Sequence, residues 1–347
     1  MQIDGYFASS NSGEGFKNYY HEVFGRIRRI YVIKGGPGTG KSRFMRDVAK
    51  YAESRGWSCE NYYCSSDPAS LDGVIMTRKG RCIGVIDGTP PHAWEPQLPG
   101  AREQIINLGD FWNADALENR ADEIERINRA KNACWKRAYK WLEGCTDMCD
   151  IIRAHGESLI NEHDVAAHAV AMLSQVADGD CFSARTALID SVGMMGCVSS
   201  DAFERCGTVY AVHDHLLTAD ILLRAFVGEA QRKKLKIAVS YDPIDPRRVD
   251  GVMADGGQVS AVVVKQTAPQ NCEHIYMRDM CASTDLTVTD EVHRAERCYE
   301  KMLLGAKAAL SDVGNRHFEL EQIYVSAMDF DAKQRFTEHF CAKVFGE

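Results

Sequence analysis

The sequence predicts an α/β protein made of two tandem copies of one domain, each with a mostly parallel sheet and an appended helical segment. Three observations lead to this prediction. Residues 67–75 read DPASLDGVI and residues 245–253 read DPRRVDGVM, with five identities at one offset of 178 residues. A buried strand, a glycine-rich loop and a helix are predicted in that order over residues 30–56. Both halves of the chain then end in long segments of helical periodicity.

The first predicted strand leads directly into the glycine-rich loop. Residues 30–33 (IYVI) are apolar and mostly β-branched, which is typical of a parallel strand buried on both faces. Residues 35–42 (GGPGTGKS) match the phosphate-binding pattern G-x-x-x-x-G-K-[ST] without deviation. Phe44, Val48 and Ala52 follow at four-residue spacing and predict a helix. This order of strand, loop and helix predicts a P-loop NTPase-like, or Rossmann-like, domain.

The residue types in this loop suit a nucleoside triphosphate with Mg²⁺. Glycines let backbone N–H groups converge on phosphates, and the positive end of the helix dipole adds to the attraction. Lys41 is expected to reach the β- and γ-phosphates and to act in catalysis, and the Ser42 hydroxyl is expected to ligate Mg²⁺. ATP or GTP is therefore the expected ligand. The residues expected to bind it are Gly35, Gly36, Pro37, Gly38, Thr39, Gly40, Lys41, Ser42 and Arg43.

A carboxylate is needed to hold the magnesium ion together with Ser42. Residues 82–87 (CIGVID) predict an apolar strand that ends in Asp87, which we expect to be that metal ligand and a catalytic residue. An ordinary turn aspartate is the alternative reading. No glutamate follows Asp87, so the base that activates the attacking group is left open. Its candidates, each of which also fits a turn or capping role, are Asp67, Asp72, His92 and Glu95.

The second half of the chain repeats the order of the first. Tyr31 aligns with Tyr210 at an offset of 179, and the matches from Tyr63 and Tyr241 onward follow at 178. Further matches at this offset are Val85 with Val263, Thr89 with Thr267 and Pro91 with Pro269. We therefore predict an active domain over residues 1–195, with a helical segment at about 115–175. A second domain with C-terminal helices follows over residues 196–347.

The second copy lacks the residues that would hold a nucleotide. Where the first copy has its glycine-rich loop, residues 214–221 read DHLLTADI. The alignment places Asp214, Ala219, Asp220 and Ile221 over Gly35, Gly40, Lys41 and Ser42, and places Lys265 over Asp87. Bulk and negative charge at these positions would repel a polyphosphate. We therefore predict one nucleotide per chain.

The helical segments and two loops suggest how the copies are used. Apolar residues at helical spacing predict helices at about 115–145 and 291–313, through which, with the sheet edges, the copies are expected to pack with pseudo-twofold character. The loops 64–73 and 88–103 follow strand ends and could form a lid or an acceptor pocket. Candidate charges for a transferring phosphoryl group are Arg78, Arg81 and Arg102.

These motifs together resemble a family. The chain looks like the uncharacterised bacterial tandem P-loop ATPases, which are also described as nucleotide kinase-like. The resemblance covers nearly the whole chain and rests on GYFASSNSGEGF, KGGPGTGKS, CSSDPASLDGVI, VIDGTPPH and INLGDFW. It implies nucleotide binding with hydrolysis or phosphoryl transfer. In that family the second copy usually keeps an intact loop, and this sequence departs from that pattern.

Composition limits the partners. The net charge of -8 argues against broad electrostatic binding to nucleic acid. No apolar run reaches the length of a membrane span, no secretory signal is present, and the 13 cysteines form no CxxC pair, so we expect a cytoplasmic protein with reduced thiols.

The expected activity is ATP or GTP hydrolysis coupled to a conformational signal or to an unidentified protein or small-molecule partner. A small-molecule or nucleotide kinase is one alternative, and a nucleotide-gated binding protein with negligible turnover is another. The oligomeric state is left open.

Overall fold

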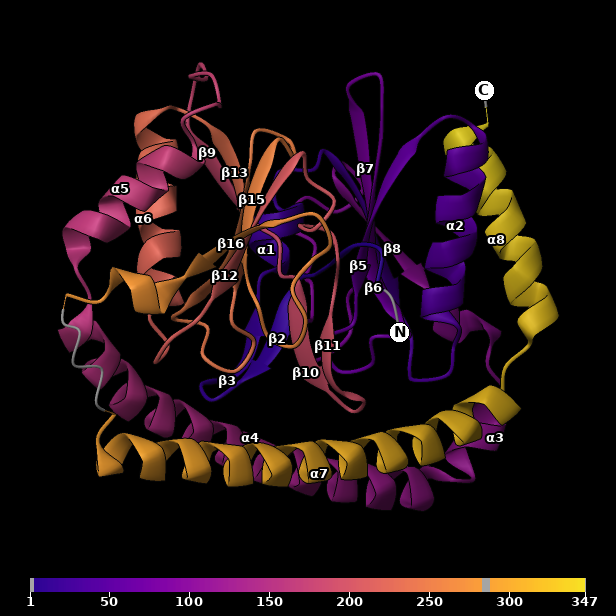
Figure 1. Cartoon of the computed structure of the whole chain (residues 1–347). Helices are drawn as coiled ribbons and strands as arrows, with labels where there is room; N and C mark the ends of the chain where they lie inside the picture. Colours follow the sequence, from indigo (N-terminus) through magenta and orange to yellow (C-terminus); the bar gives the residue numbers. More distant parts are fainter. Residues whose placement is uncertain (1–2, 283–287, 347) are drawn as a thin grey trace.

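The computed structural model describes residues 3–282 and 288–346. Two six-stranded sheets lie beside each other, and two long helices run beneath both of them (Figure 1). The long helices are α4 (Ala121–Leu159) and α7 (Asp290–Ser326), and they pack against each other along their length. The protein is thus an α/β structure in two similar halves, as predicted for its fold class.

The first sheet carries the glycine-rich loop. Its strand order is β1-β5-β6-β7-β4-β8, and three of its five neighbouring pairs are parallel. The helix that follows β4 is α2 (Lys41–Ser54), whose apolar face of Phe44, Val48 and Ala52 is fully buried against the sheet, as predicted. The strands are β1 (Tyr6–Phe7), β4 (Arg29–Lys34), β5 (Ser58–Tyr63), β6 (Leu71–Arg78), β7 (Arg81–Asp87) and β8 (Glu103–Asn107).

The second sheet repeats the first strand for strand. Its order, β9-β13-β14-β15-β12-β16, has the same three parallel and two antiparallel pairs in the same places. Helix α6 (Ala219–Arg232) follows β12 as α2 follows β4. The strands are β9 (Ser183–Thr186), β12 (Thr208–His213), β13 (Lys236–Tyr241), β14 (Val249–Ala254), β15 (Val259–Val263) and β16 (Glu273–Tyr276).

The second copy begins earlier than the predicted boundary. The hairpin β10 (Asp190–Gly193) and β11 (Gly196–Ser199) corresponds to the hairpin β2 (Ser9–Ser12) and β3 (Gly15–Asn18) near the start of the chain. The boundary between residues 195 and 196 therefore falls at the turn of a second-copy hairpin. Strand β9 also precedes this boundary, yet it pairs with β13 of the second sheet.

The start of helix α6 corrects the alignment of the two loops. The Leu71 N–H donates to Ser42 Oγ at 2.9 Å, and the equivalent Val249 N–H donates to Asp220 Oδ1 at 2.6 Å. Asp220 therefore stands in the place of Ser42, not of Lys41. Ala219 begins α6 as Lys41 begins α2. The loop is one residue shorter in the second copy, and the sequence alignment closed that gap too late.

The structure also gives Asp87 a different counterpart in the second copy from the one that the alignment predicted. Asp87 pairs with Ile33 across β4 and β7, and Val263 pairs with Val212 across the equivalent strands β12 and β15. Val263, and not Lys265, is therefore the counterpart of Asp87. The β14–β15 hairpin is two residues shorter than the β6–β7 hairpin, so the alignment at a constant offset is displaced there.

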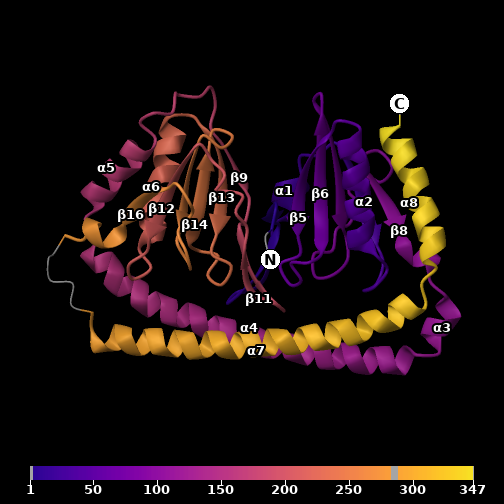
Figure 2. The ribbon, with the colours of Figure 1, turned by 45° about the vertical axis from the view of Figure 1, so that its right-hand side comes forward.

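The last helix of each copy covers the sheet of the other copy. Helix α5 (Glu162–Met172) follows α4 and packs with α6 on the second sheet, where Val165, Ala169 and Met172 are buried. Helix α8 (Phe330–Phe345) follows α7 and packs with α2 on the first sheet. Both views show this exchange at the two ends of the molecule (Figures 1 and 2). The predicted helical segments are longer than expected and cross between the copies.

The inner faces of the two sheets share one apolar core. It joins residues of both copies, including Ile30, Val32, Ile86, Ile189, Val209 and Val262. Phe24 of α1 (Tyr20–Phe24) and Phe203 are fully buried in it and fill equivalent places. The copies thus pack through sheet faces as well as through the predicted helices. Three short helical turns complete the fold: η1 (Leu108–Phe111), α3 (Ala114–Glu118) and η2 (Met277–Met280).

Across residues 3–282 and 288–346, neither the two long helices nor any shorter one has the apolar stretch that a membrane span needs. All 13 cysteines are free thiols, in agreement with the predicted absence of disulfides.

Candidate functional site

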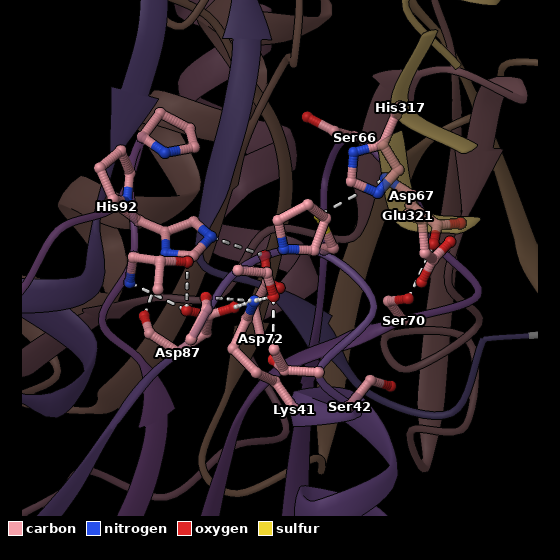
Figure 3. A pocket seen from close by; sticks show the side chains of 18 of the residues that line it. Lys41, Ser42, Ser66, Asp67, Ser70, Asp72, Asp87, His92, His317 and Glu321 are labelled. Carbon is pink, nitrogen blue, oxygen red and sulfur yellow. Dashed lines mark hydrogen bonds and ion pairs between the residues drawn. The ribbon is translucent and has the colours of Figure 1, made fainter. Parts of the chain in front are cut away.

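A pocket of about 650 Å³ lies where β4 and β7 end. The whole glycine-rich loop lines it, from Gly35 to Ser42, and so does Asp87. Figure 3 shows the side chains of Lys41, Ser42 and Asp87 in this pocket. Eight of the nine residues predicted to bind nucleotide are therefore brought together with the predicted metal ligand. The exception is Arg43, whose exposed guanidinium instead pairs with Asp47 at 3.0 Å on the surface of α2.

The glycines of the loop are required by its shape and by its neighbours. Gly38 and Gly40 have φ angles of 72° and 76°, a conformation that L side chains rarely adopt. A Cβ atom on Gly38 would lie 2.7 Å from the Glu321 carbonyl oxygen of α7, and one on Gly36 would lie 3.0 Å from the Tyr324 ring. Helix α7 therefore packs directly against the loop, and only glycine fits at that contact.

The N-terminus of α2 has no internal cap. Gly40 is its N-cap residue, and no side chain accepts a hydrogen bond from the first turn. Within the part of the chain that the structure describes, the backbone N–H groups of Gly36, Gly38, Gly40 and Lys41 donate to no acceptor. Unpaired amides at the positive end of a helix dipole form a binding site for an anion.

Lys41 and Asp87 lie next to each other in the pocket. The Lys41 Nζ donates to the carbonyl oxygens of Gly35 and Gly36 at 3.0 and 2.8 Å, and it lies 3.6 Å from Asp87 Oδ2. Thr89 holds the other carboxylate oxygen, Oδ1, through its N–H at 2.9 Å and its hydroxyl at 2.6 Å. Burial raises the pKa of Asp87, although the Lys41 charge opposes the rise. Oδ2 is thus the oxygen turned toward the loop.

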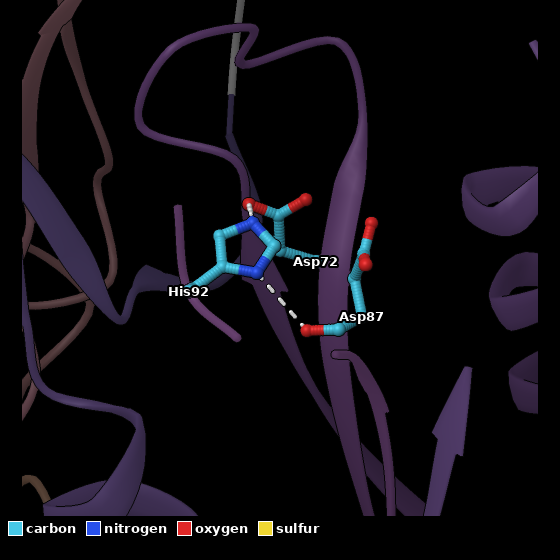
Figure 4. A group of neighbouring side chains, drawn as sticks. All are labelled: Asp72, Asp87 and His92. Carbon is cyan, nitrogen blue, oxygen red and sulfur yellow. Dashed lines mark hydrogen bonds and ion pairs between the residues drawn. The ribbon is translucent and has the colours of Figure 1, made fainter. Parts of the chain in front are cut away.

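Asp72 and His92 form a buried ion pair beside Asp87 (Figure 4). His92 Nε2 lies 3.2 Å from Asp72 Oδ2, and its Nδ1 lies 3.0 Å from the Asp87 carbonyl oxygen, to which it donates. Burial would lower the pKa of His92, but the Asp72 charge prevails and raises it to about 9. Burial would likewise raise the pKa of Asp72, which the His92 charge instead lowers. The pair is therefore imidazolium and carboxylate at neutral pH.

The other two candidates for the base differ in position. Asp67 lines the pocket and accepts a hydrogen bond from the Ser70 hydroxyl at 2.7 Å. Glu95 is 84% exposed and pairs with Lys34 at 3.3 Å, away from the pocket lining. The loop 64–73 contributes to the wall, but of the loop 88–103 only residues 88–92 do.

The three arginines proposed from the sequence do not line the pocket. Arg102 donates to the Ile27 carbonyl oxygen at 2.9 Å, and Arg81 lies over the Trp57 ring. Arg78 and Arg81 face each other at the β6–β7 turn, whereas Asp72 and Asp87 lie at the opposite ends of these strands. The expectation that these arginines supply charge to the reaction is therefore wrong.

Part of the pocket wall comes from elements that the sequence did not connect with the site. Lys131 and Trp135 come from α4, His317 and Glu321 come from α7, and Met194 comes from the turn of a second-copy hairpin. Figure 3 shows His317 and Glu321 entering from α7, across from Lys41 and Ser42. Burial and the nearby Lys131 charge lower the pKa of His317. No local motif marks these residues, because they reach the pocket only through the crossing of the long helices.

Oxygen atoms that suit Mg²⁺ are present in the pocket. Ser42 Oγ and Asp87 Oδ2 are the predicted ligands, and Asp72, Asp87 and His92 each have a potential ligand atom within 4.8 Å of the others. Asp72 Oδ2 is buried and already has His92 Nε2 as its partner at 3.2 Å, so Ser42 and Asp87 are the better-placed oxygen ligands. The residues therefore fit a hard divalent cation held by oxygen.

The equivalent region of the second copy is closed by its own side chains. Asp214 Oδ1 accepts a hydrogen bond from the Ala219 N–H at 2.8 Å, which caps the first turn of α6. Lys265 Nζ lies 2.7 Å from Asp190 and 2.8 Å from Asp250, the counterpart of Asp72.

Comparison of the chain with protein families, with curated proteins and with solved structures found no match.

Proposed function

We propose that the first copy binds a nucleoside triphosphate, ATP or GTP, with Mg²⁺ and hydrolyses it, and that hydrolysis is coupled to a conformational change or a partner. The observation that carries this proposal is the uncapped start of α2, whose unpaired amides open into one pocket with Lys41 and Asp87. A helix N-terminus, a lysine and a carboxylate at a strand end are the parts of a triphosphate site. The resemblance to the tandem P-loop ATPases supports the same proposal and membership of that family.

The loop residues would bind the phosphates in place of their present internal contacts. Lys41 would exchange the carbonyl oxygens of Gly35 and Gly36 for the β- and γ-phosphate oxygens. Ser42 and Asp87 would hold Mg²⁺, which neutralises phosphate charge. Burial of Asp87 favours its pairing with cations, because an isolated buried carboxylate is costly.

Two of the four candidate bases remain in this mechanism. His92 is protonated at neutral pH because of Asp72, so it has no free lone pair with which to accept a proton. Glu95 faces solvent. Asp67 and Asp72 are the two candidates whose carboxylates line the pocket, and either could take the proton of an attacking water.

Transfer to a small acceptor is a second candidate, and a specific observation favours it. The pocket continues past the loop to a wall that includes Phe16, Trp112, Trp135 and Met194, which a triphosphate chain does not need. Apolar and aromatic walls with a few polar groups are typical of sites for small molecules. Phosphate release that rises on addition of a metabolite would favour transfer, whereas tight binding with no release would favour a nucleotide-gated binding protein.

The test is calorimetric titration of the full chain with ATP and with GTP, together with a phosphate-release assay. Lys41→Ala should weaken binding by about 100-fold or more, because a charge-assisted phosphate contact is lost. Lys50→Ala is the matched control, since Lys50 is an exposed lysine of the same helix outside the pocket. Equal affinity of the Lys41→Ala variant and the wild type would contradict the proposed site.

A further inference from the structure

A transferring phosphoryl group needs positive charge from the side opposite the loop that holds it. Among the described residues, three lysines and no arginine line the pocket: Lys34, Lys41 and Lys131. Lys34 is fully engaged, because it donates to the carbonyl oxygens of Gly88 and Trp94 and pairs with Glu95. Lys41 belongs to the loop itself. His92 is charged but is paired with Asp72, so Lys131 is the remaining cation without a partner among the described residues.

Lys131 has no partner of its own. It makes no hydrogen bond and no ion pair with any residue that the structure describes. It is half-buried on α4, and burial lowers its pKa. An unpaired, partly desolvated ammonium is costly to maintain and is strongly attracted to an anion.

Lys131 and residues of the loop side of the pocket act on the same imidazole, that of His317. After burial, the Lys131 charge is the largest influence that lowers the pKa of His317, and the Lys41 charge adds to it. The charges of Asp67 and Asp72 act on the same imidazole. All five of these residues line the same pocket, so the charges of Lys131 and Lys41 belong to one site. The γ-phosphate would lie in this pocket next to Lys41.

We propose that Lys131 is a catalytic residue that contacts the oxygens of the transferring γ-phosphoryl group and adds its charge to that of Lys41. This inference rests on the proposed nucleotide site. In the reaction, the bond between the γ-phosphorus and the bridging oxygen breaks and its electron pair stays on the leaving diphosphate. A bond from the attacking water oxygen to phosphorus forms, and the water proton passes to a pocket carboxylate. Lys131 stabilises the negative charge on the non-bridging oxygens during this exchange.

The proposal also gives the second copy a part in the reaction. Lys131 is carried by α4, whose other end packs against the second copy, where a Cβ atom on Gly156 would lie 2.5 Å from the Leu216 carbonyl oxygen. Helix α7 of the second copy packs along α4 and brings His317 to the same wall. The charge is therefore positioned by both copies.

The test compares Lys131→Met and Lys131→Arg with the wild type and with Lys136→Ala, a control at an exposed lysine of the same helix outside the pocket. The measurements are the nucleotide Kd by calorimetry, kcat for phosphate release, and trapping of ADP with aluminium fluoride. Lys131→Met should lower kcat by about 100-fold or more and abolish trapping, with Kd changed by less than about threefold. Lys131→Arg should recover part of both, and Lys136→Ala should match the wild type.

The outcomes separate this proposal from the proposed function. Wild-type kcat in Lys131→Met would overturn the role of Lys131 and leave the nucleotide site standing. An equal loss in Kd and in kcat would also overturn it, because Lys131 would then bind the ground state as strongly as the transition state. Unchanged nucleotide affinity in Lys41→Ala would overturn the site, and this proposal with it.

Discussion

The N-termini of α2 and α6 occupy equivalent places in the two copies, but they differ in whether a side chain accepts hydrogen bonds from their backbone N–H groups. At α2 the loop amides have no acceptor among the described residues, and Lys41 and Asp87 lie close by. At α6 the Asp214 carboxylate caps the first turn, and Arg248 pairs with Asp214 at 3.1 Å. The second copy thus supplies from its own chain an anion that no described residue supplies at the start of α2.

The cation beside the repeated aspartate differs in the same way. Asp72 pairs with the imidazole of His92, whereas Asp250 pairs with the Lys265 ammonium at 2.8 Å. Burial raises the pKa of Asp250 to about 7, although Lys265 opposes the rise. The repeated aspartate is therefore paired with a cation in both copies, but the kind of cation differs. Three predictions test this comparison, beginning with the largest effect.

The first prediction concerns whether either copy folds alone. A fragment of residues 1–195 lacks α7 and α8, and so loses Phe340 and Phe345 from the core over α2. It also leaves the buried face of α5 without the second sheet. We expect this fragment to aggregate or to lack cooperative unfolding, measured by circular dichroism and size-exclusion chromatography.

The control is the full chain cleaved at a protease site inserted at residues 177–180, an exposed or half-exposed stretch that joins α5 to β9. This cleaved chain should remain one folded complex, because every helix and strand is kept. A soluble, cooperatively folded fragment of residues 1–195 would show that the copies do not depend on each other's helices.

The second prediction compares how the charges of His92 and Lys265 depend on pH. The folded pKa of His92 is raised to about 9 from 6.5, so its stabilising effect is complete below about pH 6 and is lost as the pH rises through 9. For metal-free protein in urea, the stability advantage of the wild type over His92→Gln should fall by on the order of 3 kcal/mol between pH 6 and pH 10.

Lys265 should keep its charge over that range, because its three carboxylate neighbours, led by Asp190, outweigh burial and raise its pKa well above the usual value. His163→Gln, at an exposed histidine, is the matched control. A wild-type advantage that stays constant from pH 6 to pH 10 would refute the imidazolium pair.

The third prediction concerns the substitute anion. Asp214→Ala removes the cap of α6 and leaves Arg248 without its hydrogen-bonded partner, which should cost about 1–2 kcal/mol of unfolding free energy. Nucleotide affinity should stay within about twofold of the wild type, because the first-copy loop is untouched. Asp180→Ala, at an exposed loop aspartate, controls for the loss of charge. A second nucleotide bound by the Asp214→Ala variant would show that one carboxylate alone had closed the second site.

Local patterns were sufficient to predict most of the first copy. The apolar run at residues 30–33, the glycine loop and the stripe of α2 lie within one short segment, so sequence spacing fixes their geometry. Asp87 was predicted because it ends an apolar strand. Its partner His92 was a candidate, but nothing in the sequence indicated the pairing with Asp72, which depends on how the loop after β7 folds back.

Local sequence patterns could not predict which sheet α5 and α8 cover, or the residue-by-residue alignment of the second copy with the first. Helical periodicity predicts that a helix face is buried, but it does not say which sheet buries it. The C-terminal helices were therefore assigned to the second domain, whereas α8 packs on the first sheet. The sequence alignment kept the offset of 179 residues as far as Ser42, and only the hydrogen bonds at Ser42 and Asp220 show that the offset has already changed to 178. Lys131 and His317 reach the pocket through contacts far apart in sequence.

The reciprocal placing of α5 and α8 has a consequence for how such a chain is assembled. Two separate single-copy chains that exchanged their last helices would have to meet by diffusion, and their pairing would depend on protein concentration. Here the segment between α5 and β9 joins the partners, so each meets the other at a fixed local concentration. Every molecule then contains one uncapped loop, before α2, and one loop closed by Asp214, before α6. Separate subunits that assembled freely could pair in other combinations and would not keep this ratio fixed.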